Sequence, residues 1–266
     1  MRTTWTFHSA GRIVFGVDAI ASLGDHLHEL GAETDRVLVV TDEMLVEAGV
    51  CDQVTGVLDA AGIESEVFSQ GCPEPPLELA MTCAEAAREA KAGWLLGLGG
   101  GSNMDLAKVT ACVLAHGGHP SDYLGDCVVP GPVFPLACVP TTAGTGSEVT
   151  AASVLSDPER GIKVAILSDF LRPRLSVVDP RLTVSCPVHV TADSGIDALT
   201  HAVEAFTAVT NERFPLPDGE RSVYQGSFVL TDLTAGKAIE LVGQYLRRAV
   251  EDGNDLEARE GMSLAA

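Results

Sequence analysis

The strongest constraint on the fold is the stretch GWLLGLGGGSNMDLAK at residues 93–108, where an apolar run leads into three consecutive glycines. A short apolar run that ends in glycines is typical of a buried strand, and the residues after Ser102 are typical of a helix. Glycine allows positive φ and the close approach of a ligand. Because the first N–H groups of a helix lack intrahelical partners, its N-terminus attracts anions. The stretch therefore predicts a strand, a glycine loop and a helix N-terminus that together hold a phosphate.

A tight strand-to-helix turn without a ligand explains the same residues. Gly97 and Gly99 are followed by Ser102 where the usual G-x-G-x-x-G pattern has a third glycine, and Lys108 lies too far along the chain to be the lysine of a P-loop. Ser102 and Asn103 are suited to cap the helix in either case. Both interpretations stay open on this stretch alone.

The charge balance argues against nucleic acid and membranes as partners. The chain has 37 acidic and 17 basic residues, a formal net charge of −20, and no basic stripe. Such a surface repels phosphates and anionic lipids. No stretch is as long and apolar as a membrane span, and the N-terminus lacks the pattern of a signal peptide. Together with seven cysteines that form no C-x-x-C pair, this predicts a reduced, cytoplasmic protein.

From Arg12 to about Pro140, short β-rich runs alternate with helical ones, which is typical of an α/β fold. We expect strands at residues 12–16, 36–42, 64–70, 93–99 and 133–140. Continuous apolar strands separated by helices predict a parallel sheet covered on both faces, with ligands at the carboxyl ends of the strands. The glycine loop falls at such an end.

The pattern changes after residue 150. A hairpin is expected in 151–167 and a last strand in 175–180, and the chain from Pro187 onward is predicted to be helical apart from a loop at 211–227. We therefore expect two domains, an α/β domain at 1–185 and the start of an all-helical domain at 186–266. The last helical pattern is gaining apolar residues where the sequence ends, which predicts a chain that normally continues.

Asp197 and His201 are the first candidate metal ligands. They are four residues apart in a predicted helix, so both side chains project from one face. A carboxylate and an imidazole in this arrangement suit a divalent metal, although an ordinary ion pair on a helix surface explains them equally. Catalytic metals usually take three or more protein ligands, so this pair does not complete a site.

Two further segments contain groups that suit a nucleotide. PTTAGTGSEVT at 140–150 follows a predicted strand with five hydroxyl residues, which suit ribose and phosphate oxygens. A polar turn with a helix cap at Ser147 explains it as well. Asp42 closes the predicted strand 36–42 and is placed to accept from a ribose hydroxyl, or to serve as an N-cap.

Taken in order, these motifs resemble the iron-containing, group III alcohol dehydrogenase family. They are VVTD, GGGSNMDLAK, PTTAGTGSE, a KVAI run with Lys163, LSVVDPRLT and SGIDALTHAVEAF. The resemblance covers essentially the whole chain. It implies an N-terminal Rossmann-like domain, an all-helical domain like that of dehydroquinate synthase, and a catalytic Fe²⁺ or Zn²⁺ between them. A glycerol dehydrogenase or a dehydroquinate synthase fits the PTTAGTGSE and DALTHAVEAF segments less well.

The resemblance also assigns expected roles to residues. It implies that Asp42 binds the adenosine ribose, that Lys163 lines the cofactor cleft, and that Asp197 and His201 bind the metal. The remaining cofactor-binding positions are Gly99, Gly100, Gly101 and Ser102 at the pyrophosphate and Thr141 and Thr142 at the nucleotide. NAD is expected rather than NADP, because a carboxylate at position 42 repels a 2′-phosphate.

The implied activity is hydride transfer between a nicotinamide cofactor and a small alcohol, aldehyde or hydroxyacid. The segment 208–232 is similar to the longer loop of the hydroxyacid-oxoacid transhydrogenase branch, although Phe228 and Val229 depart from that pattern. The family has two more metal-binding histidines on later helices, beyond Ala266. We therefore expect a C-terminally truncated dehydrogenase; the alternative is a non-catalytic NAD-binding remnant. Whether copies form a homo-oligomer stays open.

Overall fold

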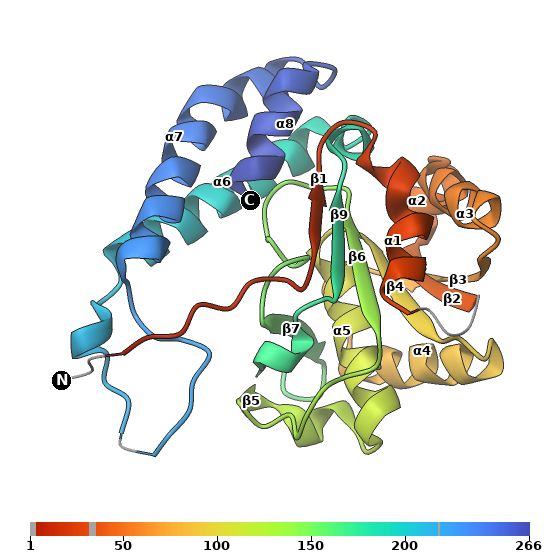
Figure 1. Cartoon of the computed structure of the whole chain (residues 1–266), viewed down its shortest axis with the longest axis horizontal. Coiled ribbons are helices and arrows are strands. Elements are labelled where there is room, and N and C mark those ends of the chain that lie inside the picture. Colours follow the sequence, from red (N-terminus) through yellow and green to blue (C-terminus); the bar gives the residue numbers. More distant parts are fainter. Residues whose placement is uncertain (1–3, 32–35, 218) are drawn as a thin grey trace. The chain divides into compact units, whose positions relative to one another are not determined.

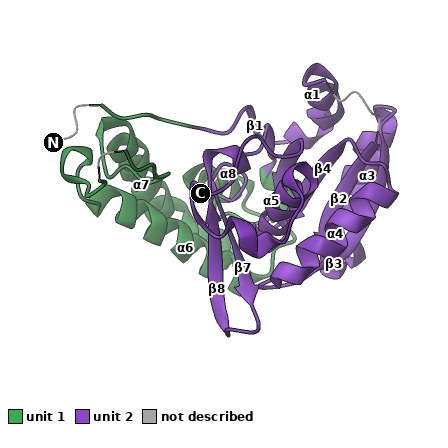
Figure 2. Ribbon diagram, turned by 90° about the horizontal axis from the view of Figure 1, so that it is seen from below, with its two compact units in different colours: residues 1–8, 142–146, 180–266 green, residues 9–141, 147–179 purple. Residues whose placement is uncertain are grey.

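The computed structural model describes residues 4–31, 36–217 and 219–266 and contains two compact units (Figures 1 and 2). The sheet unit comprises residues 9–141 and 147–179. The helical unit comprises residues 180–266 together with the segment up to His8 and residues 142–146. A parallel-sheet α/β part followed by a helical part confirms the predicted fold class. These units are groups of residues that pack together, and they do not test where one domain ends. The predicted domain boundary between residues 185 and 186 stays a prediction.

A six-stranded sheet forms the centre of the sheet unit, and every pairing in it is parallel. Its strands, in their order across the sheet, are β1 (Ile13–Phe15), β9 (Leu175–Val178), β6 (Leu136–Pro140), β4 (Trp94–Gly99), β2 (Arg36–Asp42) and β3 (Glu64–Gly71). All residues of β4 are buried, as its unbroken apolar run predicts for a central parallel strand. The strands lie within the runs predicted from sequence, except that β3 extends one residue further, to Gly71.

Helices connect most of the successive strands of this sheet. These are η1 (Ala19–Ser22), α1 (Leu23–Glu29), α2 (Glu43–Glu47), α3 (Val50–Ala60), α4 (Leu77–Glu89) and α5 (Gly101–His116), with short turns η2 (Pro120–Tyr123) and η3 (Asp169–Leu171) later in the unit. The helical stretch after β2 is broken at Gly49, whose φ of 74° is a left-handed conformation. Helices α4 and α5 pack on each other, and α1 packs on α3 (Figure 1).

The direction of winding reverses between β2 and β4. The chain leaves β2 through α2 and α3 to reach β3 on one side, and it leaves β4 through α5 to reach β6 on the other. Because crossovers between parallel strands are right-handed, connections in opposite directions lie on opposite faces of the sheet. The neighbouring strands β2 and β4 therefore form a topological switch point.

A second, three-stranded sheet follows the first. The strands β7 (Ala152–Asp157) and β8 (Ile162–Leu167) form the predicted antiparallel hairpin, and β5 (Gly125–Asp126) pairs with β8 in parallel. Gly161 ends the hairpin turn with a φ of 64°, which glycine adopts at no steric cost. The hairpin begins five residues after Ser147, so it continues the hydroxyl-rich segment.

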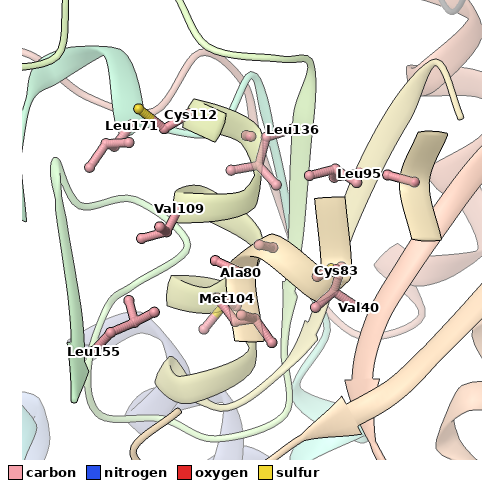
Figure 3. Close-up of a cluster of buried hydrophobic side chains, with 14 of the residues drawn as sticks. Val40, Ala80, Cys83, Leu95, Met104, Val109, Cys112, Leu136, Leu155 and Leu171 are labelled. Carbon is pink, nitrogen blue, oxygen red and sulfur yellow. The ribbon is translucent and has the colours of Figure 1, made fainter. Parts of the chain in front are cut away.

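The core of the sheet unit is formed around α5 (Figure 3). Leu95 and Leu136 come from the sheet, Met104 and Val109 come from α5, and Leu155 comes from the hairpin; all are buried. The cysteines contribute to this core as small apolar residues: all seven are free thiols and four are buried. Burial raises the pKa of Cys83, Cys112 and Cys138 to about 12, so these thiols are protonated at neutral pH and unreactive.

Three helices dominate the helical unit: α6 (Val188–Thr207), α7 (Val229–Glu251) and α8 (Leu256–Ala265), with short turns η4 (Pro180–Thr183) and η5 (Asn211–Arg213). The helix α7 packs on both α6 and α8 around buried Leu241 and Met262. In the loop before α7, Phe228 stacks on Trp5 with ring centroids 4.4 Å apart. Within the described residues, none of the helices combines the length and the apolar character needed to cross a bilayer.

Candidate nucleotide- and metal-binding site

The switch point places two candidate residues side by side. Strands β2 and β4 pair in parallel with Val40 opposite Gly97, and they end at Asp42 and Gly99. Ligands of open α/β sheets bind outside the carboxyl ends of the strands where the winding reverses. The predicted ribose-binding carboxylate and the predicted phosphate loop therefore both lie at the position where this fold binds ligands.

The glycine loop has a conformation that requires glycine. Gly99 has a φ of 138°, and a Cβ at this position would overlap the Asn103 amide nitrogen and lie 3.0 Å from Leu45 Cδ1. Gly100 is the N-cap of α5 and is extended, and no side chain caps this helix. Ser102 and Asn103 lie in the first helical turn, so their predicted role as caps is wrong. The uncapped first turn leaves backbone N–H donors for an anion.

Asp42 uses both carboxylate oxygens in the sheet unit. Its Oδ1 accepts from Leu45 N at 3.0 Å, which makes it the N-cap of α2, and its Oδ2 accepts from Asn103 Nδ2 at 2.6 Å. An ionised carboxylate has about four acceptor positions. The N-cap alternative is therefore correct, and the same carboxylate retains acceptor capacity for a ribose hydroxyl.

Asn103 is a site residue that the sequence analysis missed as a contact. Its side chain is buried, and besides Asp42 it donates to Leu98 O at 3.1 Å. The end of β3 lies equally close, because a Cβ at Gly71 would overlap the Asn103 side-chain oxygen. One amide thus links the carboxyl ends of β2 and β4. The sequence signal that could have indicated this contact is a polar residue in the first turn of the helix after the glycine loop, next to apolar residues that are buried.

The hydroxyl-rich segment leaves β6 beside the glycine loop. Gly99 lies opposite Pro140 in the β4–β6 pairing, and Thr141 N donates to Gly99 O at 3.0 Å. Thr142 begins the short stretch that belongs to the helical unit. The alternative of a helix cap at Ser147 is wrong, since the chain continues into β7 rather than a helix. The Ser147 hydroxyl donates to Asp105 instead.

Among the described residues, Lys163 has no hydrogen bond or ion pair with the other predicted cofactor-binding residues. It is on β8, its side chain is 61% exposed, and its Nζ pairs with Glu74 Oε1 at 2.9 Å. Exposed pairs of this kind contribute about 0–1 kcal/mol to stability. Its predicted role in lining the cofactor cleft stays a prediction.

Asp197 and His201 lie one turn apart on α6, as their spacing predicts. His201 Nε2 is 3.6 Å from Asp197 Oδ1, and both side chains are about half exposed. This geometry suits an ordinary ion pair and also two ligands of one divalent metal. In residues 4–31, 36–217 and 219–266 there is no group of three or more histidine, cysteine, aspartate or glutamate side chains that could hold a metal. The donor types fit Fe²⁺ or Zn²⁺, and the described ligand set is partial.

Within the helical unit, the segment 142–146 lies against α6. A Cβ on Gly144 would be 2.6 Å from both Ser194 Cβ and Ser194 O, so only glycine fits this approach. Ser194 is one turn before Asp197 on the same helix. Within the helical unit, Gly144 therefore packs one turn from Asp197 and two turns from His201 along α6.

Comparison with known proteins decides the family. Residues 10–180, which contain the switch point and the glycine loop, match the family model described as iron-containing alcohol dehydrogenase. The chain belongs to the iron-containing alcohol dehydrogenase family. The fold of this chain is similar to a crystal structure of sulfoacetaldehyde reductase from Bifidobacterium kashiwanohense in complex with NAD⁺. The TM-score is 0.84, and the sequences are 32% identical over 99% of this chain and 65% of that one.

The curated relatives that the chain matches have names that refer to different substrates. Long-chain-alcohol dehydrogenase 1 of Geobacillus thermodenitrificans (strain NG80-2) is 41% identical over 96% of this chain and 62% of its own length. The mitochondrial hydroxyacid-oxoacid transhydrogenase of Caenorhabditis elegans is 35% identical over 95% of this chain and 56% of its own length. The chain thus spans about three fifths of the length of the curated relatives it matches.

Proposed function

We propose that the chain provides the nucleotide-binding part, and a portion of the metal-binding part, of a metal-dependent oxidoreductase that transfers hydride between an alcohol or hydroxyacid and NAD. The observation that carries this proposal is the switch point. There β2 ends at Asp42, and the adjacent parallel strand β4 is followed by the glycine-rich, uncapped N-terminus of α5. This pairing of a carboxylate with an anion-binding helix end suits the ribose and the pyrophosphate of one dinucleotide.

In this proposal each residue of the sheet unit has one task. The N–H groups after Gly100 bind the pyrophosphate, because Gly99, Gly100, Gly101 and Ser102 leave the first turn of α5 open. Thr141, held by its bond to Gly99 O, contributes to nucleotide binding together with Thr142. Asp42 accepts from the adenosine ribose and disfavours the 2′-phosphate of NADP by charge repulsion.

Asp197 and His201 are the proposed metal ligands of the described chain. A bound Fe²⁺ or Zn²⁺ would supply Lewis-acid chemistry at this pair, and NAD would supply the hydride acceptor. The protein's own contribution is to hold the carboxylate and the imidazole on one helix face and to pack Gly144 against Ser194, one turn before Asp197 on α6. Further ligands would come from residues that the described chain does not bring to this pair.

The substrate class follows from family membership and charge. A small, neutral or singly charged alcohol, aldehyde or hydroxyacid is the proposed partner, and a net charge of −20 disfavours polyanions such as nucleic acid. The similarity to a hydroxyacid-oxoacid transhydrogenase and to a long-chain-alcohol dehydrogenase supports both hydroxyacids and alcohols as test substrates.

Native mass spectrometry of the 266-residue chain, with and without Fe²⁺ and NAD, tests the proposal. Retention of both ligands would support an assembled site. Retention of NAD without metal would support the alternative of an NAD-binding chain without turnover. Failure to retain NAD, with the chain folded by circular dichroism, would overturn the nucleotide site.

A further inference from the structure

The helix α5 carries one buried and one partly buried charged residue that none of the proposed ligand roles uses. Asp105 and Lys108 follow the glycine loop by one and two turns, and Lys108 is completely buried. Their side chains lie on one face because they are three residues apart. Lys108 Nζ is 3.9 Å from Asp105 Oδ1.

Asp105 forms hydrogen bonds both with the segment before the hairpin and with the first residues of β7. It accepts from the Ser147 hydroxyl and from Val154 N at 2.8 Å, while its backbone oxygen accepts from Ser153 Oγ at 3.0 Å. Burial raises the pKa of the Asp105 carboxyl, and Lys108 and Ser147 oppose that rise. The hydroxyl-rich segment is therefore tied to the first turns of α5.

Lys108 completes the attachment with all three ammonium hydrogens. Its Nζ donates to Thr150 O at 3.1 Å, to Thr150 Oγ1 at 3.0 Å and to Ala152 O at 2.8 Å. An ammonium group has three donors and no acceptor, so these three bonds satisfy it. Burial lowers the pKa of Lys108, and the neighbouring Asp105 counteracts this.

Residues 147–151 have no ladder of backbone hydrogen bonds to fix them. They lie between β6 and β7 in turns and bends, and side chains supply the missing partners: besides Lys108, Arg172 Nη1 donates to Val149 O at 2.8 Å and the Ser176 hydroxyl donates to Glu148 O. Burying a lysine costs several kcal/mol that apolar packing would not. What the lysine provides is a defined position for backbone carbonyls, which apolar contacts do not fix.

The geometry points to Lys108 as a positioning residue for the dinucleotide site. It fixes residues 150–152, and with Asp105 it sets the hydroxyl-rich segment relative to the helix that begins at the glycine loop. Lys108 itself does not touch the nucleotide. The role at the nucleotide rests on the proposed function, whereas the fixing of the segment does not.

The test uses the full chain with Lys108→Met, which keeps most of the length of the unbranched side chain and removes its donors. The matched control is Thr110→Val: Thr110 is also buried on α5, and its hydroxyl donates within the helix to Leu106 O at 2.8 Å. The first readout is amide hydrogen exchange without ligand. We expect faster exchange across residues 147–154 in Lys108→Met and wild-type exchange there in Thr110→Val; unchanged exchange in Lys108→Met would overturn the proposal.

The second readout separates positioning from a general loss of structure. NADH binding is followed by its fluorescence, and AMP binding is followed by calorimetry; AMP has the adenosine ribose and one phosphate but lacks the nicotinamide half of the dinucleotide. We expect Lys108→Met to weaken NADH about tenfold or more, as for loss of a charged hydrogen bond, and to leave AMP within about twofold. An equal loss for both ligands would contradict a positioning role.

If Lys108→Met does not fold, Lys108→Gln replaces it. An amide retains two donors, so intermediate exchange and intermediate NADH affinity are expected, and wild-type behaviour in both readouts would overturn the proposal. If wild-type protein binds neither NADH nor AMP, the proposed function fails, and the exchange experiment still decides whether Lys108 fixes the segment.

Discussion

Asn103 Nδ2 lies 2.6 Å from Asp42 Oδ2, and the same amide nitrogen donates to Leu98 O at 3.1 Å. One buried side chain therefore joins the ends of two neighbouring strands, β2 and β4, at the point where the winding of the sheet reverses. The carboxylate that we assign to the ribose is held from within the glycine-loop helix. We propose that ribose and pyrophosphate binding are coupled through this amide.

Replacing Asn103 with leucine tests that coupling. The change leaves Leu98 O and one oxygen of Asp42 without their donor, so the free energy of unfolding should fall by about 1–3 kcal/mol and NADH affinity should fall with it. Urea denaturation and NADH fluorescence titration measure the two quantities. Asn103→Asp should be worse than leucine at neutral pH, because it places a second carboxylate beside Asp42. Wild-type stability in Asn103→Leu would contradict the bond's role.

Gly99→Ala should be destabilising. Alanine at a φ of 138° is strained, and its Cβ would overlap Asn103, so we expect a loss of about 1–3 kcal/mol in unfolding free energy. Gly56→Ala is the matched control: this glycine is exposed on α3, and nothing lies within 4 Å of the added Cβ. That substitution should stabilise by about 0.4–1 kcal/mol. Equal thermal shifts for both variants would refute the conformational requirement at Gly99.

His201→Ala should remove metal retention and any metal-dependent turnover while NAD binding stays within about twofold of wild type. The reason is that His201 lies on α6, whereas the proposed pyrophosphate and ribose contacts lie in the sheet unit. His189→Ala is a suitable control, since His189 is exposed on the same helix. Metal analysis after desalting and NADH titration provide the readouts. A parallel loss of NAD binding in His201→Ala would count against the assignment.

The stability of α8 should depend on pH, because the carboxyl group of Asp255 titrates at low pH. Arg248 donates to Asp255 Oδ2 and Oδ1 at 2.8 and 3.0 Å, and this pairing, followed by the bond from Ala258 N, holds the pKa of the carboxyl below its ordinary value of 3.8. A group with a lowered pKa in the folded state stabilises above its unfolded pKa. That stabilisation is present above pH 3.8 and is lost as the pH falls through the lower folded value.

Asp255→Asn isolates this effect, because asparagine keeps the N-cap and loses the charge. The melting temperature of the variant should lie below that of wild type at pH 7, and the gap should shrink as the pH falls below 3.8. Glu251→Gln, an exposed neighbouring position on α7, should show no such convergence. A gap that stays constant between neutral and acidic pH would refute the linkage.

The parallel sheet was predictable because each strand is marked locally. The apolar runs at 36–42 and 93–99 end in residues that stop a strand, and alternation with helices determines the fold class. Asn103 and Lys108 were not recognised because their partners are remote in the sequence. Asp42 is 61 residues from Asn103, and Thr150 is 42 residues from Lys108. No periodicity of a single segment contains such pairs.

The wrong cap assignments have the same origin. Serine and asparagine favour N-cap positions in local propensity, yet the extended conformation of Gly100 starts the helix two residues earlier than a cap at Ser102 would, and Asn103 then donates to Asp42. Likewise Ser147 was given a helix to cap, although its hydroxyl is drawn to Asp105 and a strand follows. In both cases a tertiary hydrogen bond overrides a local preference.

The pairing of β1 with β9 has a consequence for how the chain is made. Val14 lies opposite Val177, and among the described strands β1 is at the edge of the six-stranded sheet, with β9 beside it. During synthesis the ribosome releases β1 first, but its partner emerges some 160 residues later, since 177 − 14 is 163. We expect β2, β3 and β4 to pair before β1 does, because closing so long a loop is slow. Until its partner is synthesised, β1 would expose unpaired backbone groups to proteases and chaperones.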